Sequence, residues 1–307
     1  AATYYGFGID DVTVELAPTF PILSLSDNDV MFPPTELDST RGVIIGVSNA
    51  GSGDLSGTIT YTAGLTGPAS FGSTDNSINV LMTPTAVGPF SGTVHIASNG
   101  GADTIMVSSV AGKSVATWDD DFNGDGELDW PVGWEVAQLA QDDQTYAGDG
   151  WSFFEDGGHT GDGYTAAEAG GYGTVNKDWL ISPIYQVEAG DSVSFYASHG
   201  VFASTNYPDI MTVHVSPTAS TNPSLFTENL DSVANMGSAW TRYAYDLSGY
   251  VGTEVRLAIV YRGEYGYEQN VDDVVGPKVV APTGPAIYDY PMAMDFSYGD
   301  THTAIGN

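Results

Sequence analysis

An acidic segment in the middle of the chain has the spacing of a calcium-binding loop. Its side-chain oxygens recur at alternate positions, and Gly126 stands sixth, where such loops turn sharply. The twelfth position, where these loops carry a bidentate glutamate, is Val132, so one ligand must come from elsewhere. The alternative is a solvated acidic turn. The predicted metal ligands are Asp121, Asn123, Asp125, Glu127 (through its carbonyl oxygen) and Asp129.

A second candidate for metal binding is the pair Asp272 and Asp273, which is flanked by Val271 and Val274. Side chains of adjacent strand residues point to opposite faces, so we expect one aspartate of the pair to face inward. A buried carboxylate needs a cation or hydrogen-bond donors. The alternative to a metal is a pair of carboxylates that accept backbone N–H groups.

The other polar motifs give weaker signals. His159 stands in an acidic stretch, residues 155–162, which makes a transition-metal site conceivable, although a lone surface histidine is the commoner case. The sequence has no His-Glu-x-x-His, Gly-x-Ser-x-Gly or phosphate-loop motif, and it has no cysteine. We therefore predict that the chain is not an enzyme.

Aromatic residues crowd the long polar loops and are candidates for ligand binding. Exposed rings can stack on sugars or anchor a protein partner. The alternative is that Trp151 and its neighbours form a folded-back strand of the core. The predicted binding residues are Trp151, Phe153, Tyr164, Tyr172, Phe202 and Tyr207.

Composition limits the class of partner. The 307 residues include 39 acidic side chains and only seven lysines and arginines, a formal net charge of −32. Such a surface repels nucleic acid and anionic lipid, attracts divalent cations and keeps an exposed chain soluble. No apolar run approaches the ~20 residues of a membrane span. We therefore expect neither nucleic-acid binding nor membrane insertion.

The pattern of apolar residues predicts an all-β protein of two sandwiches. Short alternating runs between turn residues fill residues 17–113, as in an immunoglobulin-like sandwich. Longer strands with glycine- and aspartate-rich loops fill residues 114–278 and predict a larger jelly roll. Only residues 223–236 could hold a short helix.

Part of the sequence occurs twice. Residues 9–12 (Ile-Asp-Asp-Val) match residues 271–274 (Val-Asp-Asp-Val), and Ala-Pro-Thr at residue 17 returns at residue 281, an offset of 264. The repeat predicts that residues 1–16 are the closing strand of a preceding jelly-roll unit. Residues 279–307 are then a linker and the first strand of the next immunoglobulin-like unit.

Five motifs in the second region occur in the order of a known family. They are DWPVGW (129–134), DWLISP (178–183), VSFY (193–196), Trp240 followed by DLSGYVG (246–252), and VDDV (271–274). This region resembles the cleaved-adhesin or choice-of-anchor J domains, relatives of the MAM-type jelly rolls. Residues 42–61 resemble bacterial immunoglobulin-like domains of the ASPM/SPD-2/Hydin type.

The resemblance implies tandem domains of large exported bacterial surface proteins that bind proteins or glycans. It also implies a structural calcium ion between Asp120 or Asp121 and Asp272 or Asp273. We therefore expect a non-enzymatic, calcium-stabilised segment of an extracellular surface or fibre protein, whose partners are neighbouring repeat units, glycans or surface proteins. The alternatives are a glycan- or protein-binding appendage of a secreted hydrolase and a filament subunit that assembles by strand addition.

Overall fold

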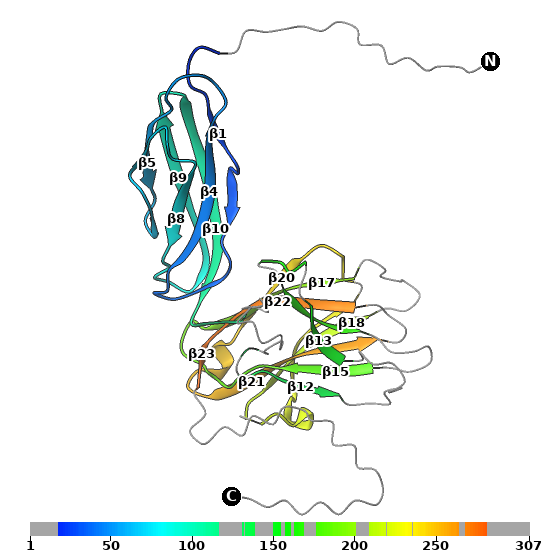
Figure 1. Cartoon of the computed structure of the whole chain (residues 1–307). Helices are drawn as coiled ribbons and strands as arrows, with labels where there is room; N and C mark the ends of the chain where they lie inside the picture. The colour runs from blue at the N-terminus through cyan, green and yellow to red at the C-terminus, as the bar shows by residue number, and fades with distance from the viewer. Residues whose placement is uncertain are drawn as a thin grey trace, which may run out of the picture.

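The structure is a computed structural model that describes residues 18–116, 131, 133–138, 150–154, 157–160, 163–168, 176–200, 209–218, 220–234, 236–263 and 268–280. These residues form two β-sandwiches joined end to end (Figure 1). The all-β class expected from the sequence is confirmed. The repeated segments, residues 1–16 and most of 279–307, lie outside the described residues.

The first sandwich packs two antiparallel-rich sheets over one apolar core. One sheet has the order β1-β4-β8-β6, and the other β2-β10-β9-β5-β7, with β3 added to β10. Alternate residues such as Ile45, Val47, Val94 and Ile96 point inward and are buried. The strands are β1 (Leu23–Leu25), β2 (Asp29–Met31), β3 (Thr35–Glu36), β4 (Arg41–Asn49), β5 (Gly57–Tyr61), β6 (Leu65–Thr66), β7 (Ser70–Phe71), β8 (Ser77–Met82), β9 (Gly88–Ser98) and β10 (Gly101–Gly112).

One sheet of the second sandwich carries the candidate site and has the order β13-β14-β22-β17-β20, with β11 paired to β22. Val271, Ala197 and Phe195 belong to the inner face of this sheet, within the main core cluster. The strands are β11 (Ser114–Ala116), β13 (Gly150–Phe154), β14 (Tyr164–Glu168), β17 (Ser192–His199), β20 (Thr241–Asp246) and β22 (Glu268–Gly276).

The opposite sheet is centred on β21, which pairs with β15, β16 and β18. Of residues 223–236, which could have held a short helix, the described ones form the 3-10 turn η1 (Pro223–Leu225) followed by β19, because the residues after the turn pair with β18. The remaining strands are β12 (Glu135–Gln138), β15 (Asn176–Ile181), β16 (Tyr185–Gln186), β18 (Ile210–Ser216), β19 (Glu228–Ala234), β21 (Glu254–Gly263) and β23 (Lys278–Val279); the second 3-10 turn is η2 (Ser248–Tyr250). Among the described residues no helix is long and apolar enough to cross a bilayer.

A single residue, Lys113, separates the last strand of the first sandwich from the first strand of the second. Its ammonium group lies 2.6 Å from a carboxylate oxygen of Glu188 and 2.8 Å from one of Asp191. These two carboxylates raise its pKa. Next to it, Gly112 packs so closely on Val275 that a β-carbon would overlap the valine side chain. The connection is therefore short, ion-paired and tightly packed.

The chain leaves the second sandwich beside the point where it enters. Ser114 lies opposite Gly276 in the β11–β22 ladder, and its hydroxyl donates to the carbonyl of Pro277 at 2.8 Å. The chain enters the first sandwich at Leu23, whose N–H donates to the carbonyl of Gly100 next to the start of β10. It leaves at Gly112, the other end of β10. The first sandwich is thus traversed along its length, whereas the second has both connections at one end.

Candidate functional site

The aspartate pair Asp272 and Asp273 lies in an irregular part of β22. The register between β17 and β22 shifts between Ser194, which faces Val275, and Tyr196, which faces Asp272. Between these two matched pairs the chain advances three residues on β22 but only two on β17, so β22 contains one additional residue. Asp273 adopts a left-handed backbone conformation, with φ of 53°. A β-bulge of this kind changes the direction of a side chain. The expectation that the two carboxylates point to opposite faces is wrong, because both contact the segment 157–160.

The Asp272 carboxylate, which is 0% exposed, accepts backbone hydrogen bonds. Its Oδ2 accepts the N–H of His159 at 2.8 Å and that of Thr160 at 3.3 Å, and its Oδ1 accepts the N–H of Asp273 at 2.7 Å. Gly158 permits this approach, since a β-carbon there would collide with the carbonyl of Gly163 and lie 3.1 Å from Asp272 Oδ2. Asp272 therefore fixes the turn that precedes β14.

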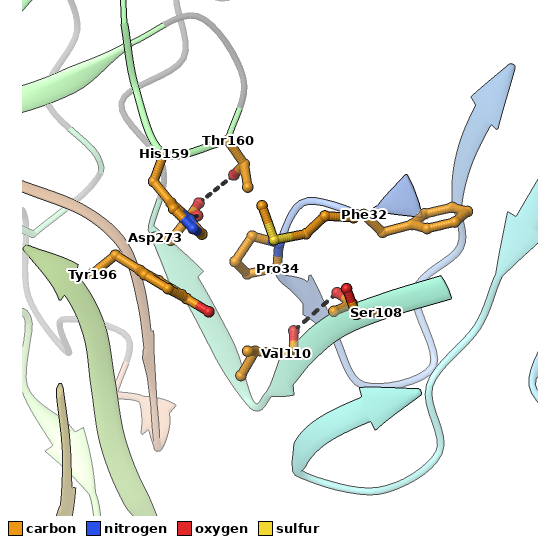
Figure 2. A pocket seen from close by; sticks show the side chains of 10 residues that line it. Phe32, Pro34, Ser108, Val110, His159, Thr160, Tyr196 and Asp273 are labelled. Carbon is orange, nitrogen blue, oxygen red and sulfur yellow. Dashed lines mark hydrogen bonds and ion pairs between the residues drawn. The ribbon is translucent and has the colours of Figure 1, made fainter. Parts of the chain in front are cut away.

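The Asp273 carboxylate contacts the side chains of the same turn (Figure 2). Its Oδ1 accepts the hydroxyl of Thr160 at 2.6 Å, and its Oδ2 lies 2.6 Å from Nδ1 of His159. The imidazole in turn stacks on Tyr196, with ring centroids 3.5 Å apart. Segment 157–160, β22 and β17 are thus held together by one hydrogen-bonded and stacked cluster.

Burial dominates the electrostatics of the cluster. Removal from water, with the nearby Asp273 as the second cause, raises the pKa of Asp272 to about 8. Burial also raises the pKa of Tyr196; Arg242 opposes this shift and Asp273 adds to it. At this site a proton or a cation would lower the free energy of the two adjacent carboxylates.

The cluster faces the first sandwich across a small pocket of ≈ 50 Å³ (Figure 2). One wall carries His159, Thr160, Tyr196 and Asp273 of the second sandwich. The other wall comes from β2, the segment that follows it, and the end of β10: Met31, Phe32, Pro34, Ser108, Ser109 and Val110. A pocket of this size accommodates a water molecule or an ion and is too small for a substrate.

The described part of this site supplies only two of the predicted calcium ligands. All four carboxylate oxygens of Asp272 and Asp273 accept, or lie within hydrogen-bond distance of, protein donors, as in the N–H-capping alternative. No group of three or more acidic or histidine ligands occurs among the described residues. A calcium ion would need further oxygens. The other predicted ligands, Asp121, Asn123, Asp125, Glu127 and Asp129, lie outside the described residues.

The predicted aromatic residues separate into core and surface positions. Trp151 is buried in the main core, where its Nε1 donates to the carbonyl of Asp178 at 3.1 Å, and Phe153 packs against the same core. The folded-back core strand is therefore the correct interpretation for these two. Tyr164 lies on the other face, stacked on Phe154. Tyr172, Phe202 and Tyr207 lie outside the described residues.

A second polar cluster, which no sequence motif indicated, lies inside the same sandwich. Nε2 of His199 lies 2.5 Å from Oδ2 of Asp209, and the hydroxyl of Tyr261 donates to Oδ1 of Asp209 at 2.8 Å. The hydrogen bond that the imidazole donates to Asp209 raises the pKa of His199 more than burial lowers it. No spacing motif joins residues that meet from three separate segments, so only the fold could reveal this cluster.

The geometry defines an all-β protein of two sandwiches with a polar cluster at their junction. The sequence matches no family model, and no curated protein matches it. Among solved structures, the K1 cleaved adhesin domain of Lys-gingipain from Porphyromonas gingivalis is 18% identical, with a TM-score of 0.39 over 52% of this chain and 95% of that chain.

Two further structures are similar at the level of fold. A carbohydrate-binding module of the β-sandwich superfamily is 14% identical over 86% of this chain and 99% of that chain, with a TM-score of 0.36. The ASH/PapD-like domain 7 of human CEP192 is 11% identical over 36% of this chain and 99% of that chain, with a TM-score of 0.29. These likenesses concern the β-sandwich fold alone.

Proposed function

We propose that the chain is a non-enzymatic binding segment of an extracellular surface or fibre protein, in which the two sandwiches act as one rigid piece. The observation that carries this proposal is the one-residue connection at Lys113. Its ion pairs to Glu188 and Asp191, together with the packing of Gly112 on Val275, oppose rotation between the sandwiches. A binding surface on one sandwich is then presented at a fixed angle to the other.

A structural role for the junction cluster fits the same function. Segment 157–160, which Asp272 and Asp273 hold, faces the first sandwich across the small pocket. The residues that could resemble a catalytic dyad, His199 and Asp209, are each 5% exposed and lie within the second sandwich. A substrate in solution does not reach such groups, so their arrangement supports stability rather than catalysis.

Calcium remains part of the proposal, with Asp121–Asp129 as its main ligands and the Asp272–Asp273 pair as a second anchor. The raised pKa of Asp272 supports a cation here, because a nearby positive charge would favour the ionised form. Assembly by strand addition is less favoured. The central position of the sheet is filled by β22, which pairs with β11, β14 and β17 of the same chain.

Small-angle X-ray scattering of the whole chain tests the rigid junction. We expect the wild-type curve to fit one fixed arrangement of the two sandwiches. Insertion of Gly-Gly-Ser-Gly between Lys113 and Ser114 should require an ensemble of arrangements. The same insertion after Thr74, in the turn between β7 and β8 of the first sandwich, is the control and should leave the curve unchanged. A wild-type curve that already requires a broad ensemble would refute the proposal.

A further inference from the structure

Two basic side chains face each other on the sheet that is centred on β21. Lys177 of β15 lies directly opposite Arg262 of β21, and both residues are exposed. Tyr261, which adjoins Arg262 along the strand, belongs to the main core, so the two basic side chains lie on the outer face. Like charges at directly opposite positions destabilise a sheet. The whole chain has only seven lysines and arginines, so a facing pair of them calls for an explanation.

The positive charge of this pair is not compensated by the described residues. No ion pair within the described part of the chain involves Lys177 or Arg262. The Lys177 ammonium lies 5.1 Å from the ring centroid of Trp179, a contact that holds the ammonium in place and leaves its charge intact. Ile210, the other cross-strand neighbour of Arg262, is uncharged. The charge of Lys177 also reaches His214, whose pKa is lowered by burial first and by this charge second.

The basic pair lies at the end of the second sandwich away from the junction. β21 begins beside Tyr185, on which Gly276 packs next to the junction, and it reaches Arg262 near its other end. The strand between Val255 and Arg262 spans about 25 Å. The first sandwich of the same chain is attached at the junction end through Lys113. It therefore does not supply the partner of the basic pair, whereas the first sandwich of a second copy can.

The first sandwich has an acidic edge of the opposite sign. Residues 18–112 contain seven acidic side chains and a single arginine. Four of the acidic residues are exposed and lie along the edge strand β2 and the segments next to it: Asp27, Asp29, Glu36 and Asp38. None of these four forms an ion pair within the described residues. The acidic edge and the basic pair are thus complementary in charge and both exposed.

We propose that the basic pair of one chain, Lys177 and Arg262, binds the acidic edge of a second copy. A guanidinium fork beside an ammonium group is suited to carboxylates. The repulsion between two copies of net charge −32 acts over longer distances, and salt at 0.15 M screens it beyond about 8 Å. Because the two surfaces differ, the contact does not close on itself, and further copies can add in the same way. The inference rests on the proposed role in a fibre protein and names the surfaces that meet.

Static light scattering of the whole chain in 0.15 M salt tests the proposal, because its concentration dependence gives the osmotic second virial coefficient. Lys177→Glu places a carboxylate opposite Arg262, which keeps the fold and neutralises the pair. Lys278→Glu is the matched control, since Lys278 is also an exposed strand lysine of the second sandwich without an ion pair among the described residues. Both variants have the same net charge. We expect the coefficient of Lys177→Glu to be the more positive, and equal coefficients would overturn the proposal.

A charge exchange tests which surfaces meet. Chains with Lys177→Glu and Arg262→Glu, mixed with chains that carry Asp29→Lys and Glu36→Lys, should attract each other, because the reversed pair then meets a reversed edge. The cross-term of the virial coefficient should be more negative than for the first variant mixed with wild type. An equal cross-term would overturn the choice of the acidic edge. The X-ray scattering of dilute chains tests the junction within one molecule, so a rigid junction with equal virial coefficients would reject this inference alone.

Discussion

His199 is a group whose charge state should affect stability near neutral pH. Its ring lies between the carboxylate of Asp209 and the carbonyl of Gly200, both of which accept hydrogen bonds, and Glu268 is the other nearby negative charge. An imidazolium, which donates from both nitrogens, satisfies these two acceptors. The pKa is therefore raised above the ordinary 6.5.

A raised histidine pKa stabilises the fold fully below pH 6.5, and the contribution is lost as pH rises through the raised value. We expect His199→Gln to cost about 1 to 3 kcal/mol at pH 6 and less at pH 9. Urea unfolding at both pH values measures this difference. Other groups titrate equally in both proteins, so the comparison isolates His199. An equal cost at both pH values would contradict the prediction.

Asp273 combines a left-handed backbone with two side-chain contacts. Asparagine tolerates positive φ and can still accept the hydroxyl of Thr160, so Asp273→Asn should cost about 1 to 2 kcal/mol. Asp273→Val places a β-branched residue at positive φ and removes both contacts, and it should cost about 3 to 5 kcal/mol. Chemical denaturation compares the two variants. Equal losses in the two variants would contradict the prediction.

At the scale of elements, Gly112 controls how closely β10 approaches β22. A β-carbon at this position would overlap a methyl group of Val275, and a side chain enclosed by both sandwiches cannot move far. We expect Gly112→Ala to lower the free energy of unfolding by about 1 to 3 kcal/mol. Gly249→Ala, where a β-carbon would meet no atom within 4 Å, is the control. A loss of the same size in both variants would contradict the close packing.

The alternation of apolar and polar residues predicts strands well in this chain because most strands have one face packed on a core. Residues 210–216 alternate in this way and form β18 with the same bounds. The short helix that residues 223–236 could have held stops after one turn, because Pro223 and the cap Asn222 start a turn that resembles a helix start but the residues that follow pair with β18. The bulge at Asp273 is not predictable, since only the pairing with β17 reveals the additional residue.

The functional residues also divide into those that a local motif identifies and those that only the fold reveals. Local motifs identify Asp272 and Asp273, which the structure places at the junction cluster. They do not identify the pair His199 and Asp209. Those roles depend on contacts between strands that are distant in the sequence, and such contacts leave no spacing signal.

At the scale of the whole molecule, calcium should stabilise the two sandwiches unequally. The predicted ligands Asp121–Asp129 and the Asp272–Asp273 pair all belong to the second region of the sequence. A chelator should therefore lower the melting temperature of the second sandwich by several degrees and leave the first almost unchanged. Differential scanning calorimetry with and without chelator measures both transitions. Identical curves would remove calcium from the proposal.

The adjacent entry and exit of the second sandwich determine how the chain would carry tension. A force between Phe20 and Val280 runs along the first sandwich, from the start of β10 to its end, a span of about 40 Å. It reaches the second sandwich where Ser114 faces Gly276 and where β23 pairs with β16, and it separates β11 from β22 and β23 from β16 one hydrogen bond after another. The first sandwich would thus bear the load in shear. Most of the second sandwich would lie outside the path that carries the load.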